Sequence, residues 1–147
     1  MLSTYRDALK RFKAPGLSSA IIILIDNDSA AKPVLSAIKQ ITGIEPDRKA
    51  PFIRALANLY VVLTPLLPGK ENSVIEDFFD DATRATKVNG KAFDASNSYS
   101  SASHYGKADF AYQVVQPNAE TIDFSGFSQL LENISLAIEA HEKRLVP

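Results

Sequence analysis

Two aspartates separated by one asparagine follow the most apolar stretch of the chain. Residues 20–25 read Ala-Ile-Ile-Ile-Leu-Ile, and Asp26-Asn27-Asp28 comes directly after them. A run of β-branched residues without alternating polar ones is typical of a strand buried on both faces, as in a parallel α/β sheet. Alternation along the strand would put Asp26 and Asp28 on one side and Asn27 on the other.

These two carboxylates suit a divalent cation. Open α/β sheets place their sites at the carboxyl ends of strands, facing the N-terminus of the next helix. Asp26 and Asp28 repel each other there, and Mg²⁺ relieves such repulsion because it prefers one or two carboxylates together with water and phosphate oxygens. We therefore interpret the pair as a Mg²⁺ site. The alternative is that the aspartates only end the strand and cap the next helix.

A second acidic group occupies residues 76–81, where four carboxylates lie within six positions. The apolar residues beside them are expected to dock this segment against the core, so at least one acid should lie near the buried surface. Glu76 is the candidate, as the neighbour of Ile75. We expect Asp80 and Asp81 to form a solvated acidic face, and a solvated position is also the alternative for Glu76.

Lys107 follows Gly106 at the start of a predicted helix. The N-terminus of a helix favours anions, so a lysine there is electrostatically misplaced. A phosphate contact would explain it, and an ordinary surface lysine is the alternative. The chain has no zinc motif and no serine-nucleophile motif, and its glycines are too sparse for a P-loop or a dinucleotide fingerprint.

The elements that would position these residues alternate between strands and helices. Pro33 fits only the first turn of a helix, and Gly43 would close it. Two predicted strands are few for a sheet that buries a run like residues 21–25, so at least one more strand is required, and a segment outside this chain is one source. We expect strands at 20–25 and 58–64, helices at 3–14, 29–41, 73–81, 105–116 and 124–144, and a hairpin around Asn89-Gly90.

The last predicted helix has the clearest apolar stripe, composed of Phe127, Leu130, Leu131, Ile134 and Ile138. The chain of 147 residues is long enough for one domain, which we place at 1–147. The net charge of −1 provides no global basic field for nucleic acid, although a local patch or a bound metal can serve that role.

Composition also indicates in which cellular compartment the protein is expected. There is no cysteine, which excludes disulfides and thiolate chemistry. The longest apolar run is too short to span a bilayer, and the N-terminal residues carry charges where a secretory signal would be apolar. A soluble cytoplasmic protein is therefore expected. A chain that lacks part of its sheet can pair an exposed edge with a second copy, so a homo-oligomer is a further expectation.

Several spaced blocks carry a family resemblance: IIILIDNDSAAKPV, NLYVVLTP, SVIEDFFD, NGKAF, HYGKADFA and IDFSGFSQLL. In this order they resemble the C-terminal region of retron reverse transcriptases that carry a Toprim-like domain, from about Tyr5 to Ile138. Toprim domains occur in topoisomerases, primases and OLD-type nucleases. The resemblance implies an α/β fold, here a partial Toprim-like one with a short, mostly parallel sheet flanked by helices.

The resemblance also implies roles for the candidate residues. Asp26 and Asp28 would hold Mg²⁺ for phosphodiester chemistry, Glu76 would be a further ligand or the general base, and Lys107 would neutralise phosphate charge. The implied partners are DNA or RNA, together with a retron reverse transcriptase and its msDNA. The chain would then be the effector part of a retron antiphage system.

The chain departs from the family pattern at two places. The family has a glutamate at the end of its first strand, and residues 1–19 contain neither a predicted strand nor a glutamate. We infer that the chain is a C-terminal portion of a longer protein, or a short relative that lost that half; the polymerase portion is absent. Second, Ser29-Ala30 follows the aspartates where the family has a residue and a glycine.

Three hypotheses follow. The first is a Mg²⁺-dependent, phosphodiester-cleaving Toprim module. The second is a non-catalytic module that binds a partner protein or nucleic acid, which the missing glutamate favours. The third is a phosphohydrolase of the haloacid dehalogenase type, which also begins with an apolar strand and Asp-x-Asp. That group expects Thr or Val where this chain has Ala30, so we rank it last.

Overall fold

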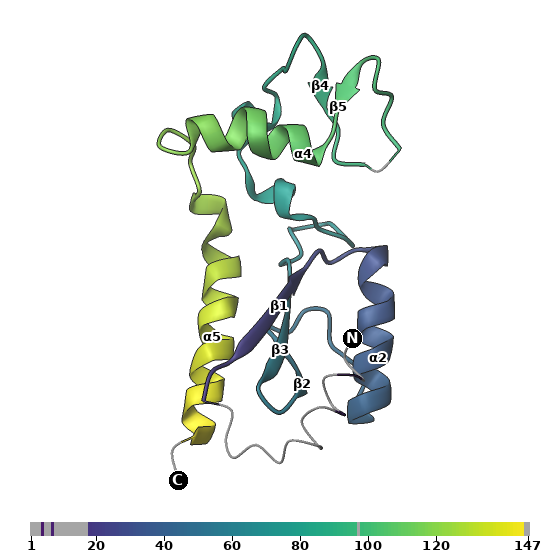
Figure 1. Cartoon of the computed structure of the whole chain (residues 1–147), viewed down its shortest axis with the longest axis vertical. Helices are drawn as coiled ribbons and strands as arrows, with labels where there is room; N and C mark the ends of the chain where they lie inside the picture. The colour runs from purple at the N-terminus through teal and green to yellow at the C-terminus, as the bar shows by residue number, and fades with distance from the viewer. Residues whose placement is uncertain (1–3, 5–6, 8–17, 97, 146–147) are drawn as a thin grey trace. The chain divides into compact units, whose positions relative to one another are not determined.

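The α/β class predicted from the sequence is confirmed, and the chain divides into two compact units (Figure 1). The computed structural model describes residues 4, 7, 18–96 and 98–145. Unit 1 comprises Met1–Val74 and Gln129–Pro147, and unit 2 comprises Ile75–Ser128. Apart from residues 4 and 7, the helix expected at 3–14 lies outside the described residues.

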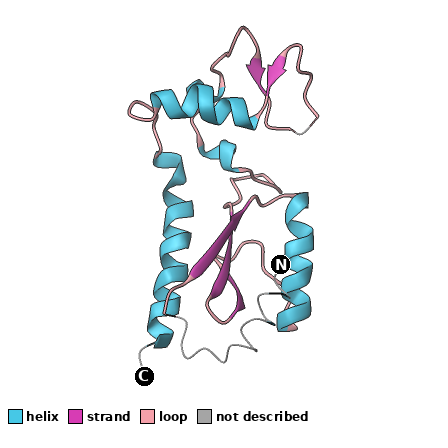
Figure 2. Ribbon diagram, viewed as in Figure 1, coloured by secondary structure: helices cyan, strands magenta, loops and turns pink. Residues whose placement is uncertain are grey.

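Unit 1 is built on a three-stranded mixed sheet with the order β1-β3-β2 (Figure 2). Strand β1 (Ile21–Ile25) is parallel to β3 (Leu59–Leu63), and β2 (Ile53–Leu56) is antiparallel to β3. The register places Ile23 opposite Val61. The carboxyl ends of β1 and β3 therefore meet at the same edge of the sheet.

The most buried strand is β3, and not β1 as the apolar run predicts. All five residues of β3 are buried, whereas Ile21 and Leu24 of β1 are 41% and 40% exposed. The expectation that β1 is covered on both faces is therefore wrong for the described structure. The reason is position, because β3 lies in the centre of this sheet and β1 at its edge.

The additional strand that the sequence required comes from within the chain. Strand β2 is only four residues long, contains Arg54, and turns into β3 through Ala57, whose φ is 38°. Such a short segment has too few residues to show strand alternation, so it escaped prediction. Ala55 is nevertheless 2% exposed and forms part of the core.

Two helices cover opposite faces of this sheet. Helix α2 (Lys32–Thr42) begins after a 3₁₀ turn, has Pro33 in its first turn and ends at Gly43, whose φ of 73° suits glycine. Val61 of β3 packs in one cluster with α2, and the ring of the preceding residue, Tyr60, packs against α5 (Ser128–Leu145). Successive strand residues point to opposite faces, so α2 and α5 lie on different sides of β3.

The predicted apolar stripe of helix α5 is confirmed at Leu130 and wrong at two other positions. Its buried residues are Leu130, Asn133, Ala137 and His141. Leu131 and Ile138, which were expected in the apolar stripe, are 59% and 40% exposed. Of the two buried polar side chains, His141 lies with its Nδ1 3.3 Å from the hydroxyl of Tyr60 of β3, and Asn133 accepts a hydrogen bond from Gln129. None of the described helices combines the length and apolarity needed to cross a membrane.

Unit 2 consists of short elements around an aromatic core. Tyr105, Phe110 and Val114 are buried, and Phe79 and Phe93 pack against them. The helix expected at 73–81 is instead a 3₁₀ turn followed by one α-helical turn, and the helix expected from residue 105 begins at Lys107. The elements are a 3₁₀ turn (Ile75–Phe78), α3 (Asp81–Arg84), β4 (Ala92–Phe93), β5 (His104–Tyr105) and α4 (Lys107–Asp109), which continues as a π-helix (Phe110–Val115). Two further 3₁₀ turns follow, at Gln116–Asn118 and Ser125–Phe127.

The turn at Asn89-Gly90 is confirmed. Both residues have positive φ, 51° and 77°, and Val88 and Lys91 form an antiparallel bridge around them. This is the conformation for which Asn-Gly is favoured in tight hairpin turns.

The contact of α2 with the sheet provides a test of the unit 1 core. Ile38 is 1% exposed and clusters with Ala55, Leu59 and Val61, whereas Ile44 is 71% exposed. We expect Ile38→Ala to lower the free energy of unfolding by about 2–5 kcal/mol, because it leaves a cavity. The matched substitution Ile44→Ala should change it by about 0.5 kcal/mol or less. Urea denaturation measures both, and equal losses would contradict this packing.

Candidate functional site

The loop after β1 is held by a fully buried asparagine. Asn27 is 0% exposed, and its backbone N–H donates to the carbonyl of Ser73 at 2.9 Å and to Oγ1 of Thr64 at 2.8 Å. Its own carbonyl accepts the N–H of Ser73 at 3.0 Å. Thr64 directly follows β3, so these bonds connect the carboxyl ends of the two parallel strands.

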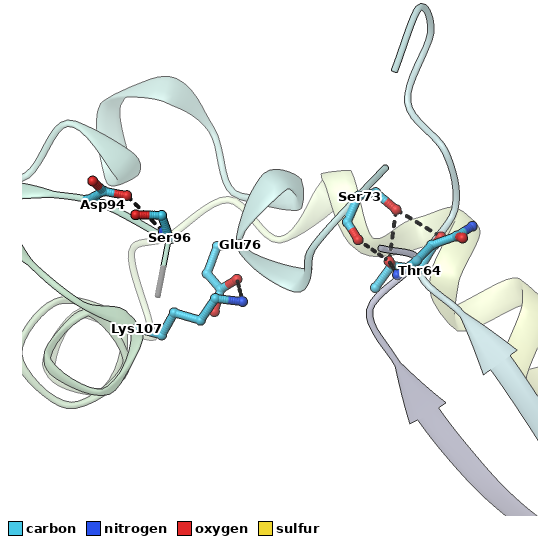
Figure 3. A network of polar contacts seen from close by, with 7 residues as sticks. Thr64, Ser73, Glu76, Asp94, Ser96 and Lys107 are labelled. Carbon is cyan, nitrogen blue, oxygen red and sulfur yellow. Dashed lines mark hydrogen bonds and ion pairs between the residues drawn. The ribbon is translucent and has the colours of Figure 1, made fainter. Parts of the chain in front are cut away.

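Thr64 and Ser73 complete this connection with their side chains (Figure 3). Their hydroxyl oxygens lie 2.8 Å apart, and Oγ of Ser73 donates to the carbonyl of Thr64 at 2.9 Å. Both residues are buried, at 0% and 1% exposure. Buried polar groups require partners, and here each hydroxyl has them.

Arg48, in the loop that precedes β2, makes further hydrogen bonds to Asn27. Its Nε donates to Oδ1 of Asn27 at 2.7 Å and its Nη2 to the carbonyl of Asn27 at 2.9 Å, while Nδ2 of Asn27 donates to the carbonyl of Arg48 at 3.0 Å. Nη2 also donates to the carbonyl of Glu71 at 3.2 Å. Sequence reasoning missed Arg48 and the role of Asn27, because no local pattern connects residues that are 21 positions apart.

The two aspartates flank this buried anchor and are partly exposed. Oδ1 of Asp28 accepts the N–H of Ala30 at 2.8 Å and so caps the 3₁₀ turn that leads into α2. The capping interpretation of Asp28 is thus correct. It does not compete with a metal role, because within the described part of the chain Oδ2 of Asp28 accepts no hydrogen bond.

The other two candidate residues form an ion pair in unit 2 (Figure 3). Nζ of Lys107 lies 2.9 Å from Oε2 of Glu76, whose side chain is 9% exposed. The prediction that Glu76 lies at the buried surface is confirmed, and Asp80 and Asp81 are exposed as expected. Glu76 also supplies the anion that accounts for a lysine at the start of α4.

The four predicted site residues thus form two pairs, one in each unit. Asp26 and Asp28 belong to unit 1, and Glu76 and Lys107 to unit 2. Among the described residues, no group of three or more His, Asp and Glu side chains is arranged to hold a metal ion. The hard oxygen donors of Asp26 and Asp28 suit Mg²⁺, which accepts one or two protein carboxylates and keeps several waters.

Three aspartates at turns of unit 2 have lowered pKa values. The pKa of Asp80 is lowered because its carboxylate accepts the backbone N–H and the hydroxyl of Thr83. The pKa of Asp94 is lowered mainly by the N–H of Ser96, and that of Asp123 by the N–H and hydroxyl of Ser125. Hydrogen bonds to the charged form account for these shifts, so they indicate local capping and not a catalytic group.

Neither a family model nor a solved structure matches this chain. The Toprim-type resemblance therefore stays a prediction from the sequence.

The anchoring of Asn27 can be tested at Arg48. We expect Arg48→Lys to lower the free energy of unfolding by about 1.5–3 kcal/mol, because an ammonium group cannot donate to both oxygens of Asn27 in the fixed geometry of a guanidinium. Arg54→Lys is the matched control, since among the described residues Arg54 donates a single exposed side-chain hydrogen bond, to the carbonyl of Ala57. Urea unfolding monitored by circular dichroism compares them. Equal, small losses would show that Arg48 does not hold the loop.

The ion pair of unit 2 is suited to a double-mutant cycle. Glu76→Gln, Lys107→Met and the double variant should give a coupling free energy of about 1–3 kcal/mol without added metal, because Glu76 is nearly buried. The exposed pair Glu139 and Lys143, 3.4 Å apart, is the control and should give about 0.5 kcal/mol or less. Coupling at Glu76 no larger than in the control would mean that Lys107 does not neutralise it.

Proposed function

We propose that this chain is a Mg²⁺-dependent, phosphodiester-cleaving module of the Toprim type, with Asp26 and Asp28 as its metal ligands. The observation that supports this most is the buried Asn27 between them. Its bonds to Arg48, Thr64 and Ser73 fix the loop at the carboxyl ends of β1 and β3. Ligands for a metal must be held in place by such supporting contacts.

The charges and donors of the loop agree with this proposal. Two carboxylates follow one strand end, one of them with an oxygen that has no protein donor in the described residues. Bound Mg²⁺ would supply a Lewis acid for the charge that develops on phosphodiester oxygens. The residues of this chain orient the ligands: Asn27 anchors the backbone, and the bond from Ala30 fixes the rotamer of Asp28.

Glu76 and Lys107 have a different part in this proposal from the one expected. Each already has the other as its charge partner. We therefore assign the metal to the two aspartates alone on this chain. The ion pair of Glu76 and Lys107 would then stabilise the start of α4. A retron reverse transcriptase and its msDNA remain the partners that the sequence resemblance proposes.

A second candidate function is a non-catalytic module that binds nucleic acid or a partner protein. It is favoured by the number of carboxylates, because the described residues bring no third acid to the loop after β1. Such a module would retain the anchored loop and bind without turnover.

Cleavage assays with single- and double-stranded DNA and RNA in Mg²⁺ separate the two. Asp28→Asn should reduce cleavage at least about a hundredfold, because a ligand charge is lost while the amide oxygen can still accept the N–H of Ala30. Asp123→Asn is the matched control. Asp123 belongs to unit 2 and accepts the N–H of Ser125 at 2.8 Å in the same local geometry, so its substitution should leave cleavage unchanged.

The outcomes differ clearly between the hypotheses. Absence of cleavage, with nucleic-acid binding that survives Asp28→Asn, would overturn the proposed function and support the second candidate. Hydrolysis of small phosphomonoesters alone would contradict both. Circular dichroism of each variant confirms that the fold is retained.

A further inference from the structure

Unit 1 contains a pocket that the sequence analysis did not predict, and none of the four candidate site residues lines it. Its volume is about 450 Å³, within the range of small-molecule sites. Every lining residue belongs to unit 1: they come from the loop before β2, the end of β3 and the segment after it, and the first turns of α5.

The charge of the pocket is of one sign. Arg48, Lys49 and Lys70 line it, and no Asp or Glu is among the lining residues. The whole chain has a net charge of −1, so this concentration of cations is a local property. Cationic side chains in a concave site favour an anion, and lysine and arginine together are typical of phosphate contacts.

The other residues that line the pocket are suited to a ligand that carries an apolar group as well as an anion. Pro51, Leu63 and Pro65 contribute apolar surface, and Gln129 and Asn133 contribute amides. Nε2 of Gln129 donates to Oδ1 of Asn133 at 3.2 Å, and Asn133 is 6% exposed, so these amides are held in place. A pocket that combines apolar surface, amides and cations can accommodate a ligand with a ring and a phosphate, such as a nucleotide.

Arg48 connects the pocket with the loop of the aspartates. The same guanidinium that lines the pocket donates to both oxygens of Asn27, between Asp26 and Asp28. Those bonds use Nε and Nη2, and in the described residues Nη1 donates to no protein acceptor. Arg48 can therefore hold the loop and still contact a ligand in the pocket.

We propose that this pocket binds one nucleotide, with Lys49 and Lys70 at its phosphate and the prolines and Leu63 beside its base. The nucleotide is either free or one unit of a single strand. The inference extends the proposed function, and it rests on that function only in choosing a nucleotide among phosphate ligands. Arg48 lines the pocket and bonds to Asn27, so the pocket adjoins the loop that carries Asp26 and Asp28.

Fluorescence anisotropy with a labelled five-residue oligothymidylate, in EDTA, tests the pocket without any metal. The double variant Lys49→Gln/Lys70→Gln should weaken binding at least about tenfold, since two charged phosphate contacts are lost. The slope of log affinity against log salt should fall in magnitude by about 1.4. Both lysines are exposed, so the fold should persist. Lys143→Gln, an exposed lysine of α5 outside the pocket, is the control and should bind as the unmodified chain does.

Competition with thymidine 5′-monophosphate identifies the source of the nucleotide. Displacement at similar concentrations supports a free nucleotide, and displacement by the unlabelled oligonucleotide alone supports a unit of a strand. The proposed nucleotide site is contradicted if the labelled oligonucleotide does not bind, or if the double variant binds it as tightly as Lys143→Gln does. Asp28→Asn should retain binding in EDTA, so loss of cleavage and loss of pocket binding are separate results.

Discussion

The buried backbone and side-chain amide of Asn27 require partners, and their hydrogen bonds determine how the end of the sheet is built. An unsatisfied buried polar group costs about 1–3 kcal/mol, so the surrounding chain must supply donors and acceptors. Arg48, Thr64 and Ser73 do so from three separate segments. Because Asn27 points inward, Asp26 and Asp28 on either side of it are partly exposed. The same bonds place Arg48 in the wall of the basic pocket.

Charge is balanced differently in the two units. In unit 2 the nearly buried carboxylate of Glu76 has the ammonium group of Lys107 as its charge partner. In unit 1 two carboxylates follow β1, and three cations line a pocket without any acid. A cation near the aspartates and a phosphate in the pocket would each relieve like-charge repulsion. The proposed metal ligands and the proposed nucleotide pocket therefore both belong to unit 1.

The sheet shows how far local pattern predicts a fold. Strands β1 and β3, helix α2 with its Pro33 start and Gly43 end, and the Asn89-Gly90 turn all follow from residue type and spacing. The burial of the two strands does not, because an apolar run looks the same at the edge of a sheet as at its centre. Strand β2 was missed because four residues are too few to establish a period. The buried face of α5 was misjudged because Tyr60 of β3 favours His141 there.

The sequence by itself determined the α/β class, the position of the aspartates after a strand and the burial of Glu76. These depend on hydrophobic periodicity and on neighbours along the chain. Only the tertiary structure decided that Asn27 is the anchor, that Lys107 neutralises Glu76 and that Arg48 joins the aspartate loop to a basic pocket. Hydrogen bonds and ion pairs depend on distances of about 3 Å between groups far apart in sequence, and such distances exist only once the chain has folded.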